Sequence, residues 1–152
     1  MPRGDRRLPD RCVPRLQSAE LILHAGDLVR ASVLRELQQL GELIAVHGNV
    51  DDHELREMLP TTTVVEVGGA IIGLVHDAGA ARGRAQRLRA LFPEADAVVF
   101  GHSHIPLHER IAGGFQLFNP GSPTERRRAP QYTMGIARAD MGQLTFELVS
   151  LG

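Results

Sequence analysis

The sequence has no lysine, no tryptophan and only one cysteine among its 152 residues. The single Cys12 excludes a disulfide within the chain and is typical of a reducing compartment, so we expect a cytoplasmic protein. No apolar run approaches the ~20 residues that span a membrane. The charged segment 1–7 is not followed by the apolar stretch of a secretion signal. We therefore expect no membrane partner.

An excess of one charge sign is also lacking. Seventeen basic and 18 acidic residues leave a formal net charge of −1, so no overall field attracts nucleic acid. The hydrophobic content of 43% is ordinary for a globular protein, and the length favours one domain over residues 1–152. Composition leaves the oligomeric state open, a homo-oligomer included.

Strands and helices alternate in the first part of the chain, and hairpins follow. Apolar runs predict strands at 21–24, 43–47 and 97–100, and helical spacing predicts helices at 13–19, 32–40, 53–59 and 80–92. Glycine-containing turns join the runs 62–67 and 70–75, 107–112 and 115–118, and 132–139 and 143–150. Alternation implies parallel strands, and the hairpins add antiparallel ones. We expect an α/β fold of two stacked mixed β-sheets flanked by helices.

Polar residues with metal-binding side chains follow four of the predicted strands. Asp27, Asn49 and His76 each come just after a strand, and His102 and His104 follow the strand 97–100. Functional sites of open α/β sheets lie beyond the carboxyl ends of the strands. Carboxylate, amide and imidazole ligands without thiolates are typical of a catalytic first-row divalent metal. The pattern predicts a metal site.

Taken singly, each of these motifs has an ordinary structural explanation. Gly-Asp and Gly-Asn pairs are common in turns, and an isolated histidine is more often hydrogen-bonded than a ligand. The combination is what favours a site, since four strand ends carry suitable groups in one chain. The other histidines, which lack such a setting, are assigned to structural or surface positions: His24, His47, His53 and His108.

With these residues in place, the sequence resembles the small calcineurin-like metallophosphoesterases of the bacterial and archaeal phosphodiesterase type. The matching segments are LILHAGDLV (21–29), AVHGNVDD (45–52), IIGLVHD (71–77), VVFGHSHIP (98–106) and NPGSPTERR (119–127). The resemblance implies a metallophosphoesterase β-sandwich and metal-dependent hydrolysis of phosphodiesters. It also implies two divalent ions, with Mn²⁺ expected first and Ni, Zn, Fe or Mg as alternatives.

The resemblance also assigns roles to individual residues. Asp27 would bridge the two metals, and Asn49, His76 and His102 would complete one metal position. His104 would belong to the other position. Asp27, Asn49 and His102 are expected to be catalytic. A further three residues of the matching NPGSPTERR segment are expected to contact the substrate: Asn119, Ser122 and Arg126.

Three positions depart from the family pattern. Val50 stands where larger members have a histidine that can serve as general acid, and Asp77 stands where many members have glycine. The family also opens with a buried strand ending in Asp-x-His, which this sequence lacks. We expect this first strand to be missing because the start is misassigned or the chain is truncated, with the native start about ten residues upstream. The chain as written should hold at most one metal tightly.

We therefore expect a cytoplasmic hydrolase, a metal-dependent phosphodiesterase in which a metal-activated water attacks a small phosphodiester. One alternative is a non-catalytic scaffold or interaction module, a role that a similar fold has in the eukaryotic retromer complex. Another is an inactive, N-terminally truncated phosphoesterase. Retention of Asn49, His76, His102 and His104 favours the enzyme, because a scaffold need not keep metal ligands.

Overall fold

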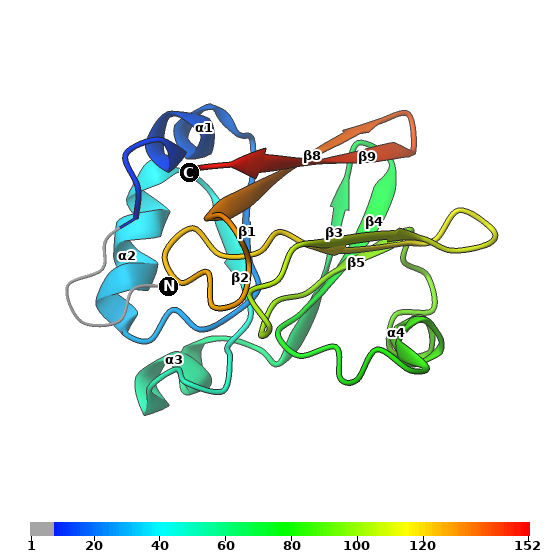
Figure 1. Cartoon of the computed structure of the whole chain (residues 1–152), viewed down its shortest axis with the longest axis horizontal. Coiled ribbons are helices and arrows are strands. Elements are labelled where there is room, and N and C mark those ends of the chain that lie inside the picture. Colours follow the sequence, from blue (N-terminus) through cyan, green and yellow to red (C-terminus); the bar gives the residue numbers. More distant parts are fainter. Residues whose placement is uncertain (1–7) are drawn as a thin grey trace.

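A computed structural model of the chain describes residues 8–152, so the expected loop at 1–7 lies outside the described residues (Figure 1). The helices are α1 (Cys12–Ser18), α2 (Ala31–Leu40), α3 (His53–Met58) and α4 (Arg84–Leu91). The strands are β1 (Ile22–His24), β2 (Leu43–Ala45), β3 (Thr62–Val67), β4 (Ala70–Val75), β5 (Ala97–Val99), β6 (Leu107–Arg110), β7 (Gln116–Asn119), β8 (Thr133–Asp140) and β9 (Gln143–Ser150). Each predicted element is present, with boundaries shifted by up to four residues.

The largest sheet has five strands in the order β3-β4-β5-β7-β6. Its strands β4, β5 and β7 run parallel, while β3 and β6 are antiparallel hairpin partners at its two edges. β1 and β2 form a separate parallel pair, and β8 and β9 form a separate antiparallel hairpin. The parallel strands therefore have their carboxyl ends on one side, where the polar motifs follow.

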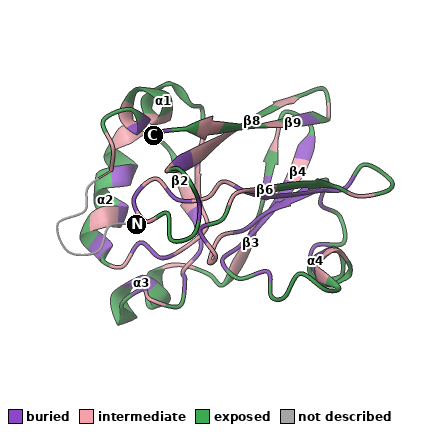
Figure 2. Ribbon diagram, in the orientation of Figure 1, coloured by how far each residue is buried: buried purple, intermediate pink, exposed green. Residues whose placement is uncertain are grey.

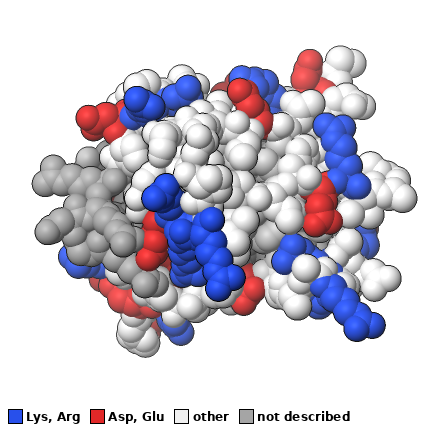
Figure 3. All heavy atoms as spheres, in the orientation of Figure 1, with Lys and Arg blue, Asp and Glu red and all other residues white. Residues whose placement is uncertain are grey.

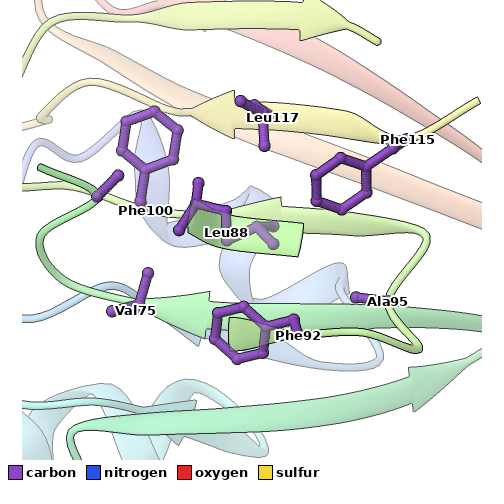
Figure 4. Packing of buried hydrophobic residues seen from close by; sticks show 9 residues of the cluster. Val75, Leu88, Phe92, Ala95, Phe100, Phe115 and Leu117 are labelled. Carbon is purple, nitrogen blue, oxygen red and sulfur yellow. The ribbon is translucent and has the colours of Figure 1, made fainter. Parts of the chain in front are cut away.

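These elements are stacked in layers that confirm the α/β class. One apolar cluster lies between the five-stranded sheet and α4, and includes Val98, Leu117, Leu88 and Phe92 (Figure 4). A second cluster fills the space between the five-stranded sheet and the β1-β2 and β8-β9 pairs. A third packs α2 and α3 beside β2. Figure 2 shows α3 largely exposed, whereas buried positions follow the central strands. The second predicted sheet is thus present as a layer of two pairs rather than as one hydrogen-bonded sheet.

Helix α4 is shorter than predicted. It begins at Arg84 because Gly83 adopts a left-handed conformation, with φ of 73°, that ends the preceding loop. Leu88 and Phe92 face the sheet, and the ring of Phe92 lies against Gly73 of β4, where a β-carbon would come within 2.6 Å of it. Glycine is therefore needed on β4 to admit the ring.

None of the helices in residues 8–152 combines the length and the apolar character that a membrane span requires.

A groove of about 630 Å³ separates β1 from β8. Its walls include Leu23, Ile72, Val99, Phe118 and Ile136, and one end is lined by His76, His102 and His104. Ile22 and His24 direct their backbone groups toward β2, so those of Leu23 face the groove. Backbone groups also alternate in direction along β8, so those of Gly135 and Ala137 point away from β9 and toward the groove. The groove is thus bounded by two strand edges without a strand partner in the described part of the chain.

Candidate metal centre

Asp27 is buried in the turn after β1, where its backbone has a positive φ of 62°. Its Oδ1 accepts a hydrogen bond from the Val50 N–H at 3.1 Å, and its Oδ2 lies 3.2 Å from His76 Nε2. Burial alone raises the pKa of Asp27, but the hydrogen bonds from His76 and Val50 outweigh it and lower the pKa to about 2. The carboxylate is therefore charged at neutral pH.

His76 follows β4, and a hydrogen bond of its Nδ1 orients the ring so that Nε2 faces Asp27. Its Nδ1 lies 2.7 Å from the carbonyl oxygen of Ala25, a geometry in which Nδ1 carries the proton and donates it. Burial lowers the pKa of His76, but the charge and hydrogen bond of Asp27 outweigh this and raise it. A histidine ring held in this way by a carbonyl is the usual arrangement of a metal ligand.

Four side-chain atoms converge at this point. His76 Nε2 lies 2.9 Å from Asn49 Oδ1, 3.2 Å from His102 Nδ1 and 3.2 Å from Asp27 Oδ2. The carboxylate oxygen of Asp27 and the amide oxygen of Asn49 can only accept hydrogen bonds. When the ring of His76 is neutral, its one proton lies on Nδ1 and is donated to the Ala25 carbonyl, so Nε2 is also an acceptor. A metal ion bound among these atoms would satisfy all four of them. Within the described residues, Asp27, His76 and His102 form one group with ligand atoms within 4.8 Å of one another.

His104, expected to serve a second metal position, lies apart from this group. It is buried, and its Nδ1 is 3.8 Å from Glu125 Oε2. Burial, followed by the charge of Arg127, lowers the pKa of His104, so the ring is neutral at neutral pH. Its assignment to a second metal stays a prediction.

Asp51 fixes the two loops that carry Asp27 and Asn49, a role that the sequence analysis missed. Its carboxylate accepts the N–H groups of Asp27 at 3.1 Å, Gly48 at 2.7 Å and Val29 at 2.5 Å. Arg56 completes the arrangement by donating to the carbonyl oxygens of Asn49 and Asp51. The only signal in the sequence was the acidic pair that follows Gly48-Asn49, which is also a common helix start.

The three residues expected to bind substrate have contacts of their own. Asn119 is fully buried, and its amide contacts the Gly101 carbonyl, Ser103 Oγ and the Gly121 N–H. Ser122 accepts hydrogen bonds from residues 124 and 125, and Arg126 donates to the Pro130 carbonyl. These positions support the loop of His102 and the turn beside it. Their contact with a substrate stays a prediction that the geometry does not favour.

Comparisons with known proteins identify the family of the chain. The model of the calcineurin-like phosphoesterase superfamily domain matches residues 4–142. The chain belongs to this superfamily. A curated protein of Methanothermobacter thermautotrophicus, named "Probable metallophosphoesterase", is 35% identical over 98% of this chain and 90% of its own length. The family recognised from the motifs is therefore confirmed.

Solved structures of this superfamily share the fold. Wild-type Vps29 of Entamoeba histolytica, complexed with Zn²⁺, has a TM-score of 0.77 and 21% identity over 100% of this chain and 94% of its own. An archaeal phosphodiesterase has a TM-score of 0.69 and 19% identity, with 91% and 90% of the two chains covered. At these identities the likeness establishes the α/β metallophosphoesterase fold and nothing finer.

Proposed function

We propose that this superfamily member is a metal-dependent phosphodiesterase that acts on small phosphodiesters in the cytoplasm. The observation that carries the proposal is the convergence of ligand atoms of Asp27, Asn49, His76 and His102 on one point. The donor set fits a first-row divalent ion, and Mn²⁺ is the first choice, with Ni, Zn, Fe or Mg as alternatives. A second ion near Asp27 and His104 belongs to the same proposal.

The chain's own residues have distinct tasks. Asp27, Asn49, His76 and His102 would hold a divalent ion, which supplies an activated water and charge for the phosphoryl oxygens. In the neutral ring of His76, Nδ1 carries the proton and donates it to the Ala25 carbonyl, which leaves Nε2 as the ligand nitrogen. Asp51 keeps the turn of Asp27 and that of Asn49 in register.

No acid group stands at position 50, where the N–H of Val50 is bound to Asp27 instead. Departure of the alcohol is therefore expected without proton donation from that position, which favours phosphodiesters with good leaving groups such as aryl esters. A flat rate across a leaving-group series would contradict this.

A non-catalytic interaction module is the second candidate, favoured by the TM-score of 0.77 with Vps29. The two candidate functions differ in whether they require metal ligands. A scaffold has no need of four converging metal-ligand atoms, and this chain retains them.

The test is hydrolysis of a bis-aryl phosphate by the purified chain with Mn²⁺ added, with EDTA added, and after dialysis followed by Mn²⁺. We expect activity with Mn²⁺ that is lost with the chelator and restored by the metal. Activity that survives exhaustive chelation would refute the metal mechanism. Tight Mn²⁺ binding without any hydrolysis would favour the interaction module or an inactive phosphoesterase.

A further inference from the structure

Three consecutive arginines lie between β7 and β8, and their side chains take different directions. All three are exposed, and Figure 3 shows basic side chains gathered over this loop. Arg126 donates to the Pro130 carbonyl at 2.9 Å and stacks on the ring of Tyr132. Arg127 instead donates from Nη1 to the backbone carbonyl of His102 at 3.0 Å. Arg127 is thus the arginine of the loop that reaches the metal centre.

The contact places a permanent positive charge at the rim of the site. His102 contributes a ring nitrogen to the converging donor atoms, and Arg127 holds its carbonyl. The guanidinium is also close enough to His104 to act on its ionisation. The one carboxylate of this loop, Glu125, is mostly buried and faces His104 at 3.8 Å. The charge presented to solvent beside the two histidines is therefore that of Arg127.

We propose that Arg127 binds the phosphoryl oxygens of the substrate and links substrate binding to the position of His102. This inference rests on the proposed phosphoesterase function. A guanidinium has five N–H donors in a planar fork that matches phosphate, and in the described part of the chain Nη1 makes the single hydrogen bond of Arg127. Arg127 is exposed, so the other N–H groups of the fork are accessible to a phosphoryl group.

The backbone of Arg127 provides a way to separate charge from folding. Its φ is +49°, in the left-handed region that glycine occupies without strain. Arg127→Gly therefore removes the guanidinium and relieves the backbone strain at position 127, but it also removes the hydrogen bond to His102, so a thermal melt is recorded to show that the variant is folded. Arg127→Lys keeps the charge but not the fork. Arg128→Ala, in the same exposed loop, is the matched control.

The experiment measures the affinity of the Mn²⁺-loaded protein for inorganic phosphate by calorimetry. Loss of charge-assisted hydrogen bonds in Arg127→Gly should weaken phosphate binding about 10- to 100-fold. Arg127→Lys should recover part of this loss, and Arg128→Ala should match the parent within about twofold. In hydrolysis assays, Arg127→Gly should raise KM more than it lowers kcat.

Phosphate affinity equal to the parent's in Arg127→Gly would overturn the proposal. So would a loss of Mn²⁺ affinity as large as the loss of phosphate affinity, because Arg127 would then act only by supporting His102. A parent protein that hydrolyses no phosphodiester would refute the proposed function, while the phosphate measurement would still decide the role of Arg127.

Discussion

Left-handed backbone conformations gather at the residues of the candidate metal centre and of the loops beside it. Asp27, His102 and His104 have φ between 61° and 69°, and Val29 and Arg127 nearby also have positive φ. Each non-glycine residue in this region costs about 1–2 kcal/mol, so surrounding contacts must hold it there. The carboxylate of Asp51 holds Val29 by accepting its N–H, and Arg127 holds His102 by donating to its carbonyl oxygen. At the scale of single residues, the site is therefore a set of strained positions fixed by hydrogen bonds.

Removal of a converging donor should weaken metal binding without unfolding the chain. Asn49→Ala and His102→Ala each delete one atom of the cluster, and neither residue belongs to the apolar core. We expect Mn²⁺ affinity to fall by at least about 10- to 100-fold, since loss of residues that only support ligands already has this effect. Calorimetric titration measures it, with the exposed His53→Ala as control. Parent-like metal binding in both variants would show that the ligand assignment is wrong.

His24 should make stability depend on pH. Burial, the largest influence, lowers the pKa of His24 to about 3, while an unfolded chain would bind a proton near the ordinary value of 6.5. The free energy of unfolding should therefore be largest above pH 6.5 and fall as the pH drops from 6.5 toward 3. Between pH 7 and pH 5 the loss from this group is up to about 2 kcal/mol.

The measurement for His24 is urea unfolding at both pH values for the parent and for His24→Asn. Asparagine keeps an acceptor for the Gly26 N–H, which His24 Nδ1 accepts at 3.1 Å, but does not titrate. The difference between the two proteins isolates His24 from His76, whose raised pKa acts in the opposite direction. An equal pH dependence in both proteins would exclude the effect of His24.

At the scale of elements, the centre depends on parallel strands that end at one side. β1 and β2 are paired in register from Ile22 to His24, and β4, β5 and β7 are parallel in the other sheet. Their carboxyl ends lead into the loops of Asp27, Asn49, His76 and His102. Asp51 then joins the loops that follow β1 and β2. Sheet pairing brings the loops together, and the buried carboxylate sets their final spacing.

The contact of α4 with β4 should tolerate no additional carbon at Gly73. A β-carbon there would lie 2.6 Å from the Phe92 ring, so Gly73→Ala should reduce the free energy of unfolding by about 1–3 kcal/mol. The matched control is Gly41→Ala, where the nearest atom to the new carbon is 3.4 Å away and the φ of 167° suits any residue. Chemical denaturation measures both. Equal stability of the two variants would mean that Phe92 moves aside at no cost.

At the scale of the whole molecule, the two layers differ in how completely their strands are paired. The five-stranded sheet is continuous, whereas β1-β2 and β8-β9 face each other across the 630 Å³ groove. β8 starts near the candidate metal centre, because Thr133 donates hydrogen bonds to the carbonyl oxygens of Pro120 and Ser122. From there the strand runs away from the centre. β1 runs toward the centre. A strand parallel to β1 would be antiparallel to β8 and would complete a mixed sheet.

The groove makes the addition of a strand between β1 and β8 testable. A synthetic seven-residue peptide of alternating valine and threonine should bind between β1 and β8 and raise the melting temperature. It should also slow amide exchange at Leu23, Gly135 and Ala137, because it pairs with their backbone groups. The control peptide carries proline at every second position and cannot complete the hydrogen bonds. Unchanged exchange at these three residues would show that the groove accepts no strand.

The sequence by itself determined the order of the elements and which side chains would meet at the candidate metal centre. Period-two and helical spacings are local, so strands, hairpins and helices were predicted within a few residues of their observed bounds. The four polar motifs at strand ends predicted that Asp27, Asn49, His76 and His102 would meet. The elements follow from patterns among neighbouring residues, whereas the meeting of the four motifs follows from their shared place at the ends of parallel strands.

Only the tertiary structure decided the remaining details of the centre. It separated His104 from the converging group, buried Asn119 beneath the loop of His102, and directed Arg127 rather than Arg126 toward the site. It also revealed Asp51 as the residue that joins two loops. These outcomes depend on positive-φ loops and on contacts between residues up to 25 positions apart, for which a single sequence carries no local signal.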